Sequence, residues 1–141
     1  MQRKFLIVAF YTHPTSLPKT AAQLFESAPW KIASVSSYDA VTGALFGSYV
    51  PDSMKNVVFT FNTDNTFTET GAKTASGTWV MVPIEDNMIA ITTNNTKTKI
   101  DWTYVITANT LSLSNPFLTV TYTDPLKPSN GYIGEELSFT H

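Results

Sequence analysis

The sequence contains no cysteine, which excludes a disulfide scaffold, a thiolate metal site and a cysteine nucleophile. Charged residues are scarce, at 14% of the chain, and the net charge of −2 offers no basic surface for nucleic acid or anionic membranes. Histidine occurs only as His13, in a proline-rich connector, and as His141, the final residue. Serine is plentiful, but only these two histidines could serve as a histidine base and no Gly-x-Ser-x-Gly motif occurs, so we expect a protein that is not an enzyme.

The acidic residues form no metal-binding or catalytic pattern. There is no calcium-loop motif and no spaced set of histidines, so we expect neither a metal nor a cofactor. Two acidic pairs, Glu85-Asp86 and Glu135-Glu136, consist of adjacent residues, which point to opposite faces of a strand and cannot converge on a substrate. We expect these four residues and Asp101 to be solvated charges at turns and strand faces.

Threonine, serine and aromatic residues are abundant instead, and they alternate. The segment Val57–Trp79 organises the chain, because Phe59 and Phe61 alternate with polar residues, as in a half-buried strand. Asp64-Asn65 then provides a tight turn, since asparagine tolerates the left-handed backbone that such a turn demands. The segment predicts three antiparallel strands. At 141 residues, 43% of them hydrophobic, the chain is long enough for one domain with a sizeable core.

The same alternation recurs along the chain, and one short helix is predicted at residues 21–27, capped by Thr20 and ended by Pro29. Further strands are predicted at residues 30–38, 79–83, 88–93, 98–107, 110–114, 117–123 and 133–140. We therefore predict an all-β fold, an antiparallel up-and-down meander of about eight strands after one short N-terminal helix. Such strands protect their edges by closing into a barrel or by pairing as a sandwich, and both remain open at this stage.

Residues 1–20 differ from the domain predicted at 21–141. Arg3-Lys4 followed by the apolar run Phe5–Tyr11 resembles the start of a secretory leader, although the run is short and no small-residue cleavage site follows. We favour an N-terminal strand that is apolar on both faces, followed by a proline-containing connector. The run is too short to cross a bilayer, so no transmembrane segment is expected.

Several aromatic and turn positions resemble the lipocalin-like domains of Bacteroidetes surface and periplasmic proteins. The matching segments are Trp30-Lys31-Ile32, Phe59–Phe67, Gly77-Thr78-Trp79, Tyr104-Val105-Ile106 and Leu111-Ser112-Leu113. The likeness covers roughly residues 21–114, and Asn65 stands where the family has a turn glycine. It implies a calycin-type barrel of eight strands, closed or partly open. Such barrels often hold one small apolar molecule, and many have no known ligand. The likeness also implies a periplasmic, cell-surface or secreted location.

The barrel interior is expected to be rich in aromatic residues. The candidate interior residues are Phe59, Phe61, Phe67, Trp79, Ile100, Trp102, Tyr104, Leu113 and Val120. One interpretation is that they simply form the core. The other is that Trp102 and Tyr104, with Phe61 and Trp79, line a ligand pocket. A long loop predicted at residues 42–53 would then close over the pocket with Phe46 and Tyr49.

Two functions from different classes follow. The first is a non-enzymatic binding protein, whose barrel holds a small hydrophobic ligand or serves as a surface recognition module. The alternative is a structural or adhesive protein, in which Phe5–Tyr11 contacts a protein partner by adding a strand to a sheet edge. We rank an enzyme behind both.

Overall fold

A computed structural model describes residues 17–39, 42–72, 74–83, 85–115 and 133–141. A single short helix, α1 (Ala21–Phe25), precedes the strands, and a 3-10 turn, η1 (Asp52–Met54), interrupts them. The strands are β1 (Trp30–Asp39), β2 (Leu45–Tyr49), β3 (Val58–Phe61), β4 (Thr66–Thr70), β5 (Ala75–Met81), β6 (Met88–Thr93), β7 (Lys99–Ile106), β8 (Thr110–Asn115) and β9 (Ile133–Thr140). The all-β prediction with one short helix is confirmed.

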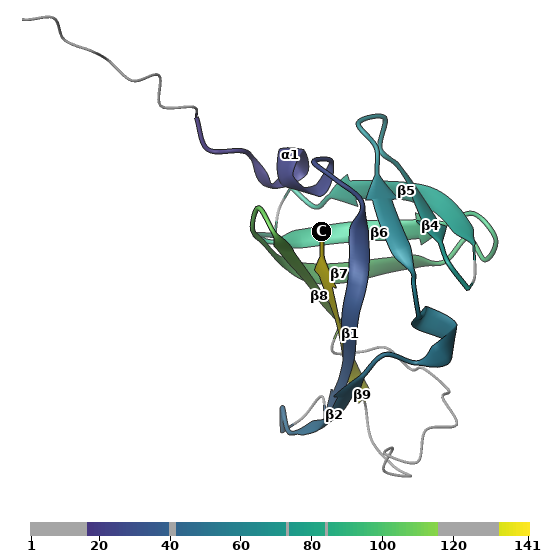
Figure 1. Cartoon of the computed structure of the whole chain (residues 1–141). Coiled ribbons are helices and arrows are strands. Elements are labelled where there is room, and N and C mark those ends of the chain that lie inside the picture. The colour runs from purple at the N-terminus through teal and green to yellow at the C-terminus, as the bar shows by residue number, and fades with distance from the viewer. Residues whose placement is uncertain (1–16, 40–41, 73, 84, 116–132) are drawn as a thin grey trace, which may run out of the picture.

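Eight of these strands form a closed antiparallel barrel. Strands β3 to β9 pair in sequence order, and β1 closes the sheet by pairing with β9 along one edge and with β3 along the other. Among the described strands, β2 alone stands outside the barrel, because it pairs with the second half of β1, beyond the part that β3 contacts. The up-and-down order is therefore correct, and the barrel replaces the sandwich (Figure 1).

The alternation seen in the sequence directs the large side chains into one interior. Phe61, Trp79 and Trp102 are buried members of a single core, together with inward residues from every strand of the barrel. On β7 the pattern is strict, since Trp102 and Tyr104 are buried while Thr103 and Val105 are exposed. A side-chain period of two on a closed sheet explains this arrangement.

Helix α1 lies across one end of the barrel, which we call the helix end (Figure 1). The β3–β4, β5–β6 and β7–β8 turns lie at the same end. Thr20 and Gln23 form a capping box, as the sequence predicts for Thr20. Phe25 is fully buried and its ring contacts those of Phe61, Trp79 and Tyr104 at centroid distances of 5.1, 5.8 and 5.2 Å. The helix therefore closes this end by inserting one ring into the aromatic cluster.

The opposite end of the barrel, which we call the far end, contains the β4–β5 and β6–β7 turns. The prediction of one long loop at residues 42–53 is wrong, because residues 45–49 form β2 and residues 52–54 form η1. Asn65 adopts a positive φ of 66°, as predicted for the β3–β4 turn. The predicted strands at Phe5–Tyr11 and at 117–123, with Val120, lie outside the described residues.

Candidate functional site

A cavity of about 110 Å³ lies inside the barrel, in the half nearer the far end, and it is partly open to solvent. Its lining residues come from six strands and share the inward phase of the alternation. They are Phe59, Phe67, Glu69, Ile91, Thr93, Ile100, Trp102, Leu113 and Leu137. The helix half of the interior is occupied instead by Phe25 and the rings around it. A second, more open hollow lies at this end between α1 and β7, and Leu24, Tyr104 and Ile106 are among its lining residues.

The cavity wall changes from apolar to polar along its depth. On β4, Phe67 is buried nearer the helix end, and the next inward residue, Glu69, lies closer to the far end. On β6, Ile91 and Thr93 repeat this order. The two polar side chains therefore lie toward the far end, while rings and aliphatic groups form the deeper part. A site with an apolar body and a few placed polar groups is typical of small-molecule pockets.

Gly77 explains how the ring of Phe67 is placed in this wall. Gly77 faces inward on β5, directly between Phe67 on β4 and Thr93 on β6. A Cβ at this position would lie 2.7 Å from the Phe67 ring and would overlap the backbone oxygen of Thr92. Neither neighbour leaves room for a side chain at residue 77. The absence of a side chain lets β6 pack closely against β5 and lets the Phe67 ring lie over the glycine.

The structure separates the six residues predicted to contact a ligand into three groups. Trp102 lines the cavity. Phe61, Trp79 and Tyr104 are buried with Phe25 at the helix end, and burial, followed by the charge of Asp86, raises the pKa of the Tyr104 hydroxyl. Phe46 and Tyr49 lie on β2, and neither lines this cavity.

Four lining residues were absent from the predicted interior set: Glu69, Ile91, Thr93 and Leu137. A signal for Glu69 existed, since it stands two residues after Phe67 and shares its face. Thr93 stands in the same relation to Ile91. Polar residues in phase with buried apolar ones are therefore the sequence feature that marks this wall.

The burial of Glu135 shows that the prediction of a solvated charge at this position is wrong. Glu135 is only 7% exposed, although the sequence favoured solvated charges at both Glu135 and Glu136. The physical reason is its phase on β9, because Leu137 and Phe139 are buried on the same face and the alternation turns Glu135 inward with them. It lies one step beyond Leu137 toward the far end, and it takes part in an interaction there.

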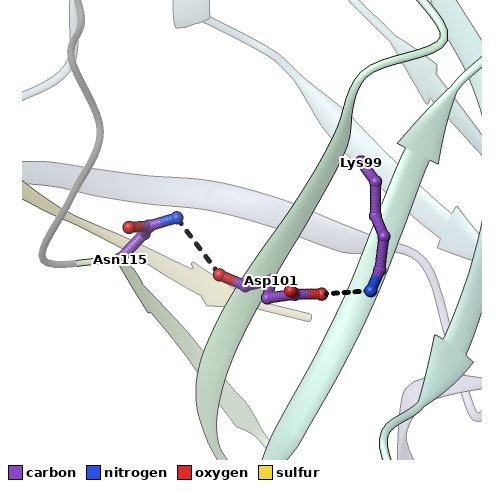
Figure 2. A network of polar contacts seen from close by, with 3 residues as sticks. All are labelled: Lys99, Asp101 and Asn115. Atoms are coloured by element: carbon purple, nitrogen blue, oxygen red, sulfur yellow. Dashed lines mark hydrogen bonds and ion pairs between the residues drawn. The ribbon is translucent and has the colours of Figure 1, made fainter.

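Asp101, by contrast, lies on the outer face, as predicted. Figure 2 shows its carboxylate 3.2 Å from the Lys99 ammonium, while its backbone oxygen accepts a hydrogen bond of 3.1 Å from the Asn115 amide. Both ion-pair side chains are substantially exposed, so this contact adds little stability. The pair belongs to the solvated surface of β7 and not to the cavity.

Within the described ranges, no cluster of three or more histidine, cysteine or acidic residues could hold a metal ion. The ring of His141 stacks on Trp30 with centroids 4.1 Å apart and contacts the backbone oxygen of Ala108, both at the helix end. His141 therefore lies at the opposite end of the barrel from the cavity. In the part of the chain that the structure describes, no helix is long and apolar enough to span a membrane.

The comparisons with known proteins support the fold alone. No protein-family model matches the chain, and no curated protein matches it. Among solved structures, it is similar to a DUF4847 family protein from Bacteroides vulgatus, with a TM-score of 0.52 and 17% sequence identity. The likeness covers 86% of this chain and 97% of that one, so both share the same barrel architecture over nearly their whole lengths.

Proposed function

We propose that this protein is a non-enzymatic binding protein that holds a small apolar molecule in the far half of its barrel. The observation that carries the proposal is the cavity of about 110 Å³, in a barrel whose other half is packed with rings. An apolar cavity of about 150 Å³ accommodates benzene. A partly open cavity three-quarters of that size accepts an aromatic ring or a short alkyl chain whose polar end stays near the opening.

The lipocalin-like type is part of this proposal. Its support is the series of matching segments beginning at Trp30-Lys31-Ile32, together with the closed barrel of eight strands and its covering helix. An exported location follows from the same resemblance. Fractionation of the producing cells checks it, with the protein expected in the periplasmic, surface or secreted fraction; a purely cytosolic protein would contradict this part.

Ligand binding is tested by nuclear magnetic resonance of the indole N–H groups. The protein has three tryptophans. Trp102 lines the cavity, whereas the Trp30 and Trp79 indoles donate to the backbone oxygens of Phe25 and Asn62 near the helix end. Benzyl alcohol should shift the Trp102 signal saturably and leave the other two nearly unchanged. Equal shifts at all three, or none at Trp102, would refute the proposed site.

A cavity-filling variant provides the matched control. Ile100→Phe adds a ring to a half-buried residue of the cavity wall and should abolish the Trp102 shift. Ile106→Phe makes the same change on the same face of β7 at the helix end, outside the cavity. It should leave benzyl alcohol binding within about twofold of wild type, because surface and peripheral changes usually have small effects.

A further inference from the structure

The charge pattern of the cavity narrows the class of ligand. We infer that the site prefers a small apolar molecule that carries a positively charged amine, with the apolar part deep in the barrel and the ammonium beside Glu69. This inference rests on the proposed function and deepens it. The inference rests on the single carboxylate among the described lining residues, on its place toward the far end, and on the aromatic rings in the wall.

Glu69 is the single ionisable side chain among the nine described lining residues, and none of them is basic. Its carboxylate accepts hydrogen bonds and attracts a cation. The Thr93 hydroxyl, which is hydrogen-bonded to the Thr96 hydroxyl, has a second lone pair that can accept a hydrogen bond from the ligand. Glu69 already takes part in an interaction, so a bound ammonium would share or replace that partner. An anionic ligand such as a fatty acid would meet repulsion at this position and would find no basic group among these residues.

The rings in the wall favour the same charge. Phe59, Phe67 and Trp102 line the cavity, and the electron-rich face of an aromatic ring attracts a cation within about 6 Å. Glu135, buried on the inward face of β9 beyond Leu137, adds a second acidic residue toward the far end. These two inward carboxylates, each of which already takes part in an interaction, would oppose an acidic ligand and favour an amine.

The position of Glu69 fixes the orientation of the ligand. Phe67 precedes it on the same face of β4 and lies nearer the helix end, so the apolar wall begins directly below the carboxylate. A ring with an aminomethyl group therefore places its ring against the deeper wall and its nitrogen toward the opening. This arrangement leaves the ammonium partly hydrated and avoids the cost of burying an isolated charge.

The test uses three probes of nearly equal shape at pH 7: benzylamine as the cation, benzyl alcohol as the neutral form and benzoate as the anion. Their dissociation constants are read from the Trp102 indole shift. Wild type should bind benzylamine about tenfold more tightly than benzyl alcohol, as expected for one charge-assisted hydrogen bond, and benzoate most weakly. The preference for benzylamine should diminish as salt is added.

Glu69→Gln keeps the size and hydrogen-bonding ability of the side chain but removes its charge. It should bring benzylamine and benzyl alcohol to within about twofold of one another, without weakening benzyl alcohol. Glu85→Gln is the matched control, because it removes the same charge from an exposed turn at the helix end and should keep the preference.

The outcomes separate the two levels of the argument. If benzyl alcohol binds but benzylamine has no advantage in wild type, or keeps its full advantage in Glu69→Gln, the amine preference is wrong and the binding function stands. If no probe shifts the Trp102 signal, both are wrong. Should Glu69→Gln fail to fold, the order of the three probes and its salt dependence in the wild-type protein still decide the inference.

Discussion

Phe25 provides the most quantitative test of how the barrel is closed. Its ring is fully buried and contacts three other aromatic rings, and its backbone oxygen accepts a 2.9 Å hydrogen bond from the Trp30 indole. Helix α1 has only five residues, far too few to be stable alone, so it depends on this anchor. Phe25→Ala should therefore detach α1 as well as leave a cavity.

The expected cost is about 3 kcal/mol or slightly more, at the lower end of the usual range for a buried phenylalanine. The loss of stability has an upper limit, because the variant can lose no more than all the contacts that α1 makes with the barrel. For a domain of this size the cost corresponds to a fall in Tm on the order of 10 °C. The free energy of unfolding is measured by urea titration, followed by tryptophan fluorescence, which should shift to the red as Trp79 becomes hydrated.

Leu24→Ala is the control for this measurement. Leu24 lies beside Phe25 on the same helix but is only partly buried, so its truncation should cost about 1 kcal/mol or less. A loss below about 1 kcal/mol for Phe25→Ala, or equal losses for the two variants, would refute the view that the ring of Phe25 closes the barrel.

Two further predictions concern the sheet and its turns. Gly77→Ala should destabilise the protein by about 1–3 kcal/mol in the same urea assay, because the new methyl group collides with the Thr92 oxygen and the Phe67 ring; an unchanged midpoint would contradict the close approach. The hydrogen bonds from the Thr66 hydroxyl and then its backbone N–H lower the pKa of Asp64 below its ordinary value of 3.8. Their stabilisation is present above that value and is lost as pH falls through the lowered pKa, so the stability difference between wild type and Asp64→Ala should shrink between about pH 5 and pH 2; a constant difference would exclude this role.

Much of the barrel could be predicted because its strands alternate cleanly. The strand predicted at residues 88–93 matches β6, and the turn at Asp64-Asn65 is correct. Strand β2 was predicted as a loop because Gly47 interrupts its apolar residues and Gly43 and Pro51 flank it. This composition is typical of a loop. Strand β2 forms by pairing with β1, and this pairing cannot be read from the local sequence of residues 45–49.

The candidate site was only partly predictable, for a different physical reason. Alternation identifies which residues point inward, but it cannot say where the interior is filled and where it is hollow. That depends on Phe25, which enters from the helix and packs one half of the barrel. Glu69 and Glu135 were missed for another reason: their charge suggested exposure to solvent, although their phase on the strand places them on the inner face.

The most direct test of the binding site is a crystal structure of the protein soaked with benzylamine. We predict electron density for the ring between Trp102, Ile91 and Leu137, with the nitrogen within hydrogen-bonding distance of the Glu69 carboxylate. An interior filled by side chains with no density for the probe, or a probe bound only on the outer surface, would contradict the account.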